Sequence, residues 1–497
     1  MVRNIHPNRS QAVEQILGSN PPGRVLVVPI DFAKKEHVAQ ICRGSGEFIF
    51  RRPMALQNTV AGADYLLKRI EGCCRKHCIP DTNVLVVGED PPEYVSGFVH
   101  HVQAAGKLFV RVNAKEAKKY RTNTRATSDK LVLNGIAQAA MCRRAYDLVE
   151  DDELYAVMKT SERARRQLVR SATATKSRVH RCVDVLFPGF MDEKRSGLPR
   201  FSRASMELMS KDFSTGRIKR MKTETLSGLL KRNRTHNPAD VVAKLKKLAQ
   251  DTFAPPAKLT PYHSRSLAVK VGLLRSESEA LDDEENEMAR ALVQTPGFYL
   301  TSIPGAGIVL AGGIVAEYGR TGSWRPVDQM ASYGGIVPHQ YQSGGSESEP
   351  VVGGLPRDCN HHLKNWLFQV AQHVGMTEHP AWRHVGLPGT HPLREHYLRV
   401  EANNGHTMIS TAKRLLHIAR AMVRDCRIYL PTNSLNGDHP DAMSVEQYMQ
   451  YNQIVLKSVL AKWKKYDLSG IPDDRNYLQL WIKEINEWTK FIMKDRT

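Results

Sequence analysis

The chain has 497 residues, of which 41% are hydrophobic and 25% charged, values that are ordinary for globular proteins and allow two to four domains. Lysine and arginine total 71 against 51 acidic residues, so the formal net charge is +20. This excess favours a polyanionic partner, nucleic acid before an anionic membrane surface. The most apolar early run ends at Asp31 and is too short to span a bilayer, and the polar start lacks a signal-peptide core. We therefore expect a cytoplasmic protein with no membrane segment.

Residues 1–150 are predicted to form an α/β domain. Apolar runs at Arg24–Ile30, Val84–Val87 and Leu108–Val112 have the length and composition of buried strands. A helical stretch, Asn58–His77, separates the first two runs. Strands that alternate with helices indicate a sheet covered by helices.

Residues 151–298 are predicted to be helical. Leu154–Leu186 carries a dense cationic face and contains almost no turn residues, and a second long helix is expected over His263–Leu292. Two such helices around an irregular basic insert suggest an antiparallel coiled-coil arm. An ordinary helical bundle is the alternative that the pattern leaves open.

Residues 299–430 are predicted to form a mainly α domain. It opens on the turn Pro304–Gly307 before a helix of small residues, and it ends with the cationic helix Met408–Cys426. Residues 431–497 are predicted to be a helical C-terminal extension that serves packing or oligomerisation.

Three acidic residues lie where a metal site could form. Asp31 and Glu89 each follow an apolar strand directly, and Asp129 begins a predicted helix, Ser128–Met141. Acids just beyond buried strands can meet at one edge of a sheet, where they repel each other unless a cation neutralises them. A pair of Mg²⁺ ions does this and also supports phosphodiester chemistry. Each acid taken alone is also consistent with a turn or helix cap.

Several blocks of the chain resemble, in the same order, those of the insertion-sequence-110 family of DEDD transposases, which are related to the Piv invertases and are now called bridge-RNA-guided recombinases. The resemblance covers roughly residues 24–430. The blocks are Val25–His37, Val86–Tyr94, Gly106–Asn113 with Ser128, Asp129, Ile136 and Ala137, Arg165–Val179, Leu300–Gly319 and Ala331–Gly345. The resemblance implies a RuvC-like (RNase-H-like) catalytic domain at 1–150 and a C-terminal transposase domain at 299–430, in a prokaryotic, nucleoid-associated enzyme.

The resemblance also implies site residues. Asp31, Glu89 and Asp129 match the first three metal ligands of the family, and Ser343 matches its nucleophilic serine. The family's fourth acid falls at Val132, which cannot bind a metal. The fourth ligand is therefore missing or supplied from elsewhere, for which Asp90 and Glu93 are weak candidates.

By the same resemblance, the serine and two Mg²⁺ ions held by the carboxylates would form a composite active site, which could be completed between protomers of a dimer or tetramer. Donor and target DNA and a guide RNA are the implied partners. A guide RNA would recognise DNA sequence by base pairing, so the protein would need only cationic surfaces that bind the nucleic-acid backbone whatever its sequence. The residues expected to contact nucleic acid lie on the Arg-rich helix, at the glycine turn and on the last cationic helix: Arg163, Arg166, Arg170, Lys176, Arg178, Gly305, Gly307, Lys413 and Arg414.

We therefore expect a recombinase that excises and inserts a mobile element. Three rivals remain open: a Piv-like site-specific invertase, a domesticated and catalytically silent nucleic-acid-binding protein, and a Holliday-junction nuclease that needs no Ser343. Val132 is the feature that favours the silent protein.

Overall fold

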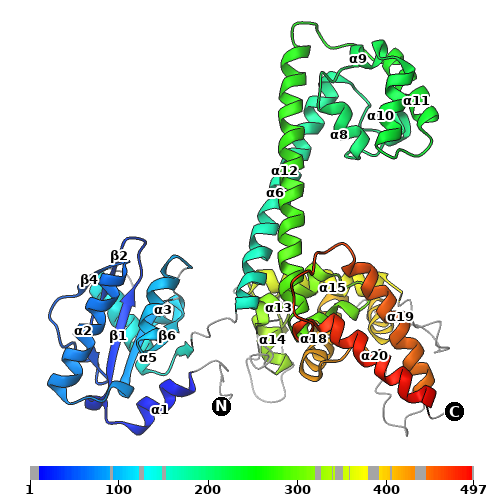
Figure 1. Ribbon diagram of the computed structural model, residues 1–497. Helices are drawn as coiled ribbons and strands as arrows, with labels where there is room; N and C mark the ends of the chain where they lie inside the picture. Colours follow the sequence, from blue (N-terminus) through cyan, green and yellow to red (C-terminus); the bar gives the residue numbers. More distant parts are fainter. Residues whose placement is uncertain are drawn as a thin grey trace. The chain divides into compact units, whose positions relative to one another are not determined.

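The computed structural model describes eleven segments of the chain: residues 10–89, 93–121, 128–147, 153–319, 326–338, 340–341, 351–357, 359–378, 391–402, 406–430 and 444–494. The chain divides into two compact units, Met1–Glu150 and Asp151–Thr497 (Figure 1). No helix within the described segments is both long and apolar enough to cross a membrane.

The first unit is built on one mixed sheet. Its strands lie in the order β4 (Met54–Gln57), β2 (Glu36–Ala39), β1 (Leu26–Asp31), β5 (Val84–Glu89), β6 (Leu108–Val112) and β7 (Ala145–Asp147), and β3 (Cys42–Arg43) also pairs with β1. The three central strands β1, β5 and β6 are parallel, and the others are antiparallel to their neighbours. This is the strand order of an RNase-H-like fold, so the α/β prediction for the N-terminal part is confirmed.

Helices cover both faces of the sheet (Figure 1). Side chains of α2 (Val60–His77) and α3 (Ser96–Ala104) pack on one face, with alternate residues of β1 such as Val28. Those of α1 (Gln11–Ser19), α4 (Ala114–Lys119) and α5 (Asp129–Met141) pack on the other face. Because both faces are buried, the central strands are continuous apolar runs, which is why they could be recognised in the sequence.

The second unit begins with an arm of two 34-residue helices, α6 (Glu153–Leu186) and α12 (Thr260–Val293), which lie side by side and antiparallel (Figure 1). They are also joined by polar contacts: Arg165 donates to Glu285 over 2.8 Å, and the buried carboxylate of Glu277 accepts from Ser171 and Thr175. Two long antiparallel helices thus lie in the part of the chain for which the sequence suggested an arm.

The arm carries a small helical domain at its far end, which we call the head and define as residues 187–259. Its helices are α7 (Glu193–Ser196), α8 (Arg203–Met209), α9 (Thr215–Arg220), α10 (Thr223–Arg232) and α11 (Pro238–Asp251). They pack on the ends of α6 and α12 around a core of their own that includes Phe187, Phe190 and Phe213.

The other end of the arm joins a helical C-terminal core. Its elements are η4 (Pro296–Ser302), α13 (Ile308–Tyr318), α14 (Val327–Tyr333), α15 (His361–Met376), α17 (Pro392–Ala402), α18 (Thr407–Asp425), α19 (Val445–Trp463) and α20 (Tyr477–Lys494), with the short pair β8 (Gln340–Tyr341) and β9 (Val351–Val352). Trp463 and Trp481 of the two last helices contact Phe298 of η4, with ring centroids 5.4 and 6.2 Å away. The helices after residue 444 therefore share this core.

Candidate active site

Two of the three predicted carboxylates end neighbouring strands. Ile30 of β1 is registered with Gly88 of β5, so Asp31 and Glu89 follow at adjacent positions on the same edge of the sheet. Neighbouring strands lie about 4.8 Å apart, which leaves the two side chains within reach of one ion. Both residues are partly buried.

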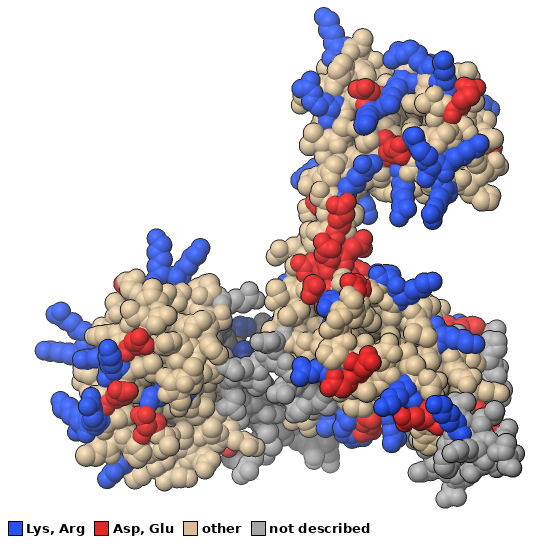
Figure 2. All heavy atoms as spheres, in the orientation of Figure 1, with Lys and Arg blue, Asp and Glu red and all other residues tan. Residues whose placement is uncertain are grey.

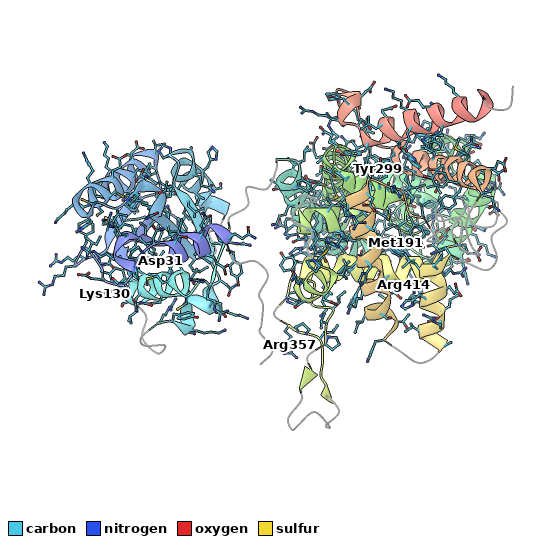
Figure 3. All side chains as sticks on the ribbon, turned by 90° about the horizontal axis from the view of Figure 1, so that it is seen from below. Asp31, Lys130, Met191, Tyr299, Arg357 and Arg414 are labelled. Carbon is cyan, nitrogen blue, oxygen red and sulfur yellow. The ribbon has the colours of Figure 1, made fainter. Side chains whose placement is uncertain are left out.

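Asp129, the third carboxylate, is the first residue of α5, which packs across β1 and β5. Burial and the charge of Asp129 raise the pKa of Asp31, and the guanidinium of Arg121 opposes this shift. Figure 3 labels Asp31 and Lys130, the residue after Asp129, in this unit. The structure thus brings all three acids to one edge.

Arg121 is a member of this cluster that sequence reasoning missed. Its guanidinium lies 3.7 Å from the carboxylate of Glu89, and its side chain is largely buried. A Cβ on Gly135 of α5 would lie 2.8 Å from the Arg121 side chain and 2.5 Å from the carbonyl oxygen of Ala117. Glycine at 135 therefore lets α4 and Arg121 approach α5.

The donor set at this edge fits a divalent cation. Carboxylate oxygens are the ligands that Mg²⁺ prefers, and three carboxylates here face one guanidinium, which leaves an excess of negative charge. Burial, and after it the charge of Asp129, raises the pKa of Asp31, and a bound cation would favour its ionised form.

The structure places Val132 in the hydrophobic core. Its side chain is 7% exposed and belongs to the cluster between α5 and the sheet, with Leu85 and Val87. It lies one helical turn after Asp129 and supplies no oxygen. A fourth carboxylate is therefore absent from this position, and of the two suggested substitutes Asp90 lies outside the described residues and Glu93 is described only in its backbone.

Ser343 also lies outside the described residues, in the segment 342–350. The strands that precede and follow this segment, β8 and β9, pair antiparallel through Gln340 with Val352 and Tyr341 with Val351.

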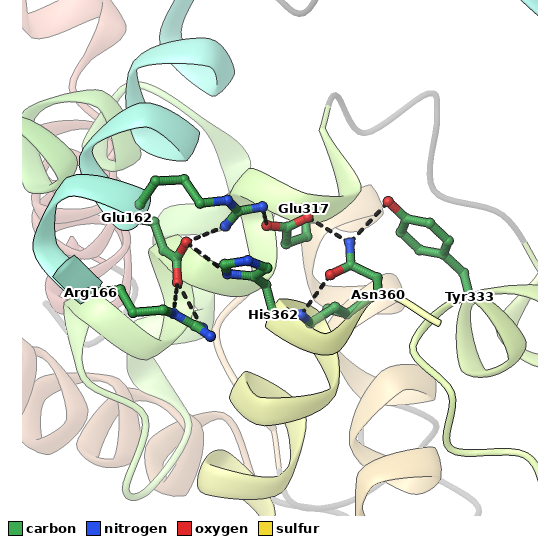
Figure 4. Close-up of polar contacts among 8 residues, drawn as sticks. Glu162, Arg166, Glu317, Tyr333, Asn360 and His362 are labelled. Atoms are coloured by element: carbon green, nitrogen blue, oxygen red, sulfur yellow. Dashed lines mark hydrogen bonds and ion pairs between the residues drawn. The ribbon is translucent and has the colours of Figure 1, made fainter. Parts of the chain in front are cut away.

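Arg163 and Arg166, two of the predicted nucleic-acid contacts, are engaged inside the protein (Figure 4). Arg163 donates to Glu162 and to Glu317 of α13, and Arg166 lies 2.9 Å from Glu162. Asn360 at the start of α15 donates to Glu317 over 2.6 Å and to the Tyr333 hydroxyl over 2.9 Å. We call these residues, with His362, the arm-base network, because they tie α6 to α13, α14 and α15.

The arm-base network has the ligand types of a metal site but not its charge. Glu162, Glu317 and His362 each bring one ligand atom within 4.8 Å of the others. Burial opposes ionisation of Glu162, but the hydrogen bond and charges of Arg163 and Arg166 hold its pKa below the usual value. Two guanidinium groups already balance the two carboxylates, so a structural ion-pair network explains the cluster better than a metal centre.

The other predicted nucleic-acid contacts are placed differently. Arg170, Lys176 and Arg178 are exposed on the arm. Gly305 has φ +76°, and a Cβ there would lie 2.8 Å from His373, so close packing on α15 requires glycine at this position. Gly307 precedes α13 with open space around it. On α18, Lys413 lies 2.9 Å from Asp328, and Arg414, which Figure 3 labels, lies beside His396.

Comparison with known proteins gives two family matches. Residues 28–188 match the model of the DEDD transposases of the IS110 family, and residues 298–385 match that of the IS116/IS110/IS902 transposase family. A relative from Streptomyces clavuligerus, described as an insertion element IS116 uncharacterized 44.8 kDa protein, is 27% identical over 135 residues. That alignment covers 27% of this chain and 30% of the relative. The carboxylate-bearing sheet lies inside the first match, and the two matches together span half of the sequence: the chain belongs to the IS110 family of transposases.

Proposed function

We propose that this protein is a divalent-metal-dependent DNA transposase that cuts and rejoins DNA strands to move a mobile element. The observation that carries the proposal is the meeting of Asp31, Glu89 and Asp129 at one edge of an RNase-H-like sheet. Donor and target DNA are the substrates, in keeping with the net charge of +20.

The carboxylates would hold up to two Mg²⁺ ions, which supply charge for phosphodiester chemistry when bound. Asp31 and Glu89, fixed by their strands, would bind and orient this charge, and Asp129 would complete the ligand set from α5. Before metal binds, the positive charge of Arg121 would offset part of the repulsion between the carboxylates in the folded protein.

Ser343 is proposed as the nucleophile. Its Oγ would form a bond to phosphorus while the P–O bond to the leaving strand breaks, and its proton would pass to a base or to the leaving oxygen. The phosphoserine link would conserve the bond for attack by a strand hydroxyl. The resemblance to the insertion-sequence-110 family further implies a guide RNA and a homo-oligomeric state, which are part of this proposal.

Recombination between donor and target plasmids in cells tests the proposal. The gene with its native flanking DNA would be compared with Asp31→Asn and Ser343→Ala, and with the matched controls Glu71→Gln, an exposed acid of α2, and Ser346→Ala. We expect joined product from wild type and both controls and none from the two site variants. Joining that persists in Asp31→Asn would contradict the proposal.

The buried Val132 favours a second candidate, a nucleic-acid-binding protein that has lost catalysis. It predicts folded protein that binds DNA but gives no joined product even with the complete native element.

A further inference from the structure

We propose that the head, residues 187–259, is a separate nucleic-acid-binding domain that recognises phosphodiester backbone next to unpaired bases. Apart from its first two residues, the head lies outside both family matches, which end at residue 188 and resume at 298, so the family assignment does not explain it. The inference does not depend on the carboxylate site or on Ser343.

The charge of the head is the first observation. Residues 187–259 contain 16 lysines and arginines against 7 acidic residues, which is an excess of nine in a domain of 73 residues. Figure 2 shows these basic side chains standing out from the head with few acidic ones among them. Polyanions are the partners that such a surface attracts.

The basic residues gather around the junction of α9 and α10. Lys219, Arg220 and Lys222 are exposed there, and no described carboxylate lies within ion-pair distance of them. Lys246 of α11 donates to the carbonyl oxygens of Ile218 and Lys219 over 2.9 and 3.0 Å, which places α11 against the end of α9, and Lys247 is the exposed next residue of α11. We call Lys219, Arg220, Lys222 and Lys247 the junction patch.

The positive charge of the junction patch is not needed to hold the head together. The head has its own apolar core, and the ammonium group of Lys246 satisfies carbonyl oxygens at the end of α9, whereas the junction patch takes no part in these contacts. Four exposed cations without a carboxylate partner are suited to binding phosphates, a contact that requires no particular base sequence.

An exposed aromatic ring lies at the other end of α9. Phe253 is 92% exposed, and its carbonyl oxygen accepts from Thr215, the first residue of α9, over 3.4 Å. A six-residue helix is about 9 Å long, so the ring is within a few nucleotides of the junction patch. An exposed ring at this distance from the cations can stack on an unpaired base of a strand whose phosphates they bind, a contact that duplex DNA does not offer.

Binding of labelled 20-nucleotide RNA, single-stranded DNA and duplex DNA to the full-length protein in EDTA tests the proposal. The junction-patch variant Lys219→Gln/Arg220→Gln/Lys222→Gln/Lys247→Gln would be compared with an equal charge change on exposed lysines in the last part of the chain. These lysines lie on α19, directly after it and on α20: Lys457→Gln/Lys464→Gln/Lys483→Gln/Lys490→Gln. We expect at least about tenfold weaker single-strand binding for the first variant only. The slope of log K against log salt should also become shallower by roughly 0.7 for each phosphate that the variant no longer neutralises.

Phe253→Ala tests the base contact, with the exposed Trp488→Ala of α20 as its control. We expect Phe253→Ala to bind single strands about tenfold more weakly, with little change for duplex DNA. The tighter-binding probe, RNA or single-stranded DNA, identifies the natural ligand of the head. Equal losses in the head and tail variants, with unchanged salt slopes, overturn the proposal. The proposal is also overturned if the head variants bind nucleic acid normally and lose only binding to anionic phospholipid vesicles, which would identify a membrane surface as the partner.

Discussion

The guanidinium of Arg121 lies 3.7 Å from the carboxylate of Glu89, at the edge of the sheet where Asp31 and Asp129 also meet. In the absence of metal, this arginine offsets part of the negative charge of the three acids. We therefore expect Arg121→Gln to destabilise the metal-free protein and to increase the stabilisation by Mg²⁺ by about 3 °C in melting temperature. Thermal melts with EDTA and with 10-fold steps of Mg²⁺ measure both effects, and Arg75→Gln, an exposed position on α2, is the control. If Mg²⁺ raised the melting temperature of Arg121→Gln by the same amount as that of wild type, Arg121 would not act at the ion site.

Asp31→Asn is expected to have opposite effects on activity and stability. Burial and Asp129 raise the pKa of Asp31 above its unfolded value, so this group favours folding when protonated and disfavours it once the pH rises through the folded pKa. At neutral pH the neutral amide should raise the melting temperature of the metal-free protein while strand joining falls at least about 100-fold. Loss of activity accompanied by a lower melting temperature would instead point to damaged folding.

Val132→Asp places a carboxylate where the family has its fourth acid. The side chain is in the core, so the substitution should cost about 3 kcal/mol in EDTA. If this position faces the ion site, Mg²⁺ should restore much of that loss, and Val132→Asn should respond less. Destabilisation that Mg²⁺ does not relieve would mean that position 132 is purely a packing position.

The positions of Asp31 and Glu89 at strand ends could be predicted from the sequence. The strands β1 and β5 are buried on both faces, so they form unbroken apolar runs that end at these two residues. The short strands β2 and β4 were not recognised in the sequence, since each is four residues long and only every second position is buried. Arg163 could not be assigned, because its partner Glu317 lies 154 residues away and only packing joins them. A cationic stripe on a helix looks the same in sequence whether it faces solvent or a buried carboxylate.

The arm-base network should be a large contributor to the stability of the second unit. Glu162 is fully buried and accepts from Arg163 and Arg166, so Glu162→Ala would leave the partly buried guanidinium of Arg166 without its carboxylate and Arg163 with Glu317 alone. We expect a loss of about 3–5 kcal/mol in the free energy of unfolding. Chemical denaturation measures it against Glu279→Ala, an exposed acid on α12, which should change stability by under about 0.5 kcal/mol. Similar losses in the two variants would show that the network is solvated.

Lys462 should give the second unit a distinct alkaline pH dependence. Burial lowers its pKa to about 8, and its ammonium group donates to the carbonyl oxygens of Thr301 and Ala306 beside the glycine turn. The unfolded chain binds this proton more tightly, so the contribution of Lys462 to stability is smallest below pH 8 and rises up to the unfolded pKa near 10.5. Relative to Lys462→Met, wild type should gain roughly 3 kcal/mol over this window. Parallel pH profiles for the two proteins would refute this assignment.

The pairing of α6 with α12 has a consequence for the chain as a whole. The helix that leads into residues 187–259 and the helix that leads out of them lie side by side. The head could therefore be replaced by another segment between the end of α6 and the start of α12. A short turn could close α6 onto α12 as a plain hairpin, with the C-terminal core undisturbed. The head is thus joined in sequence to the rest of the chain through the two helices of the arm, so it can be deleted without interrupting the sequence of the C-terminal core.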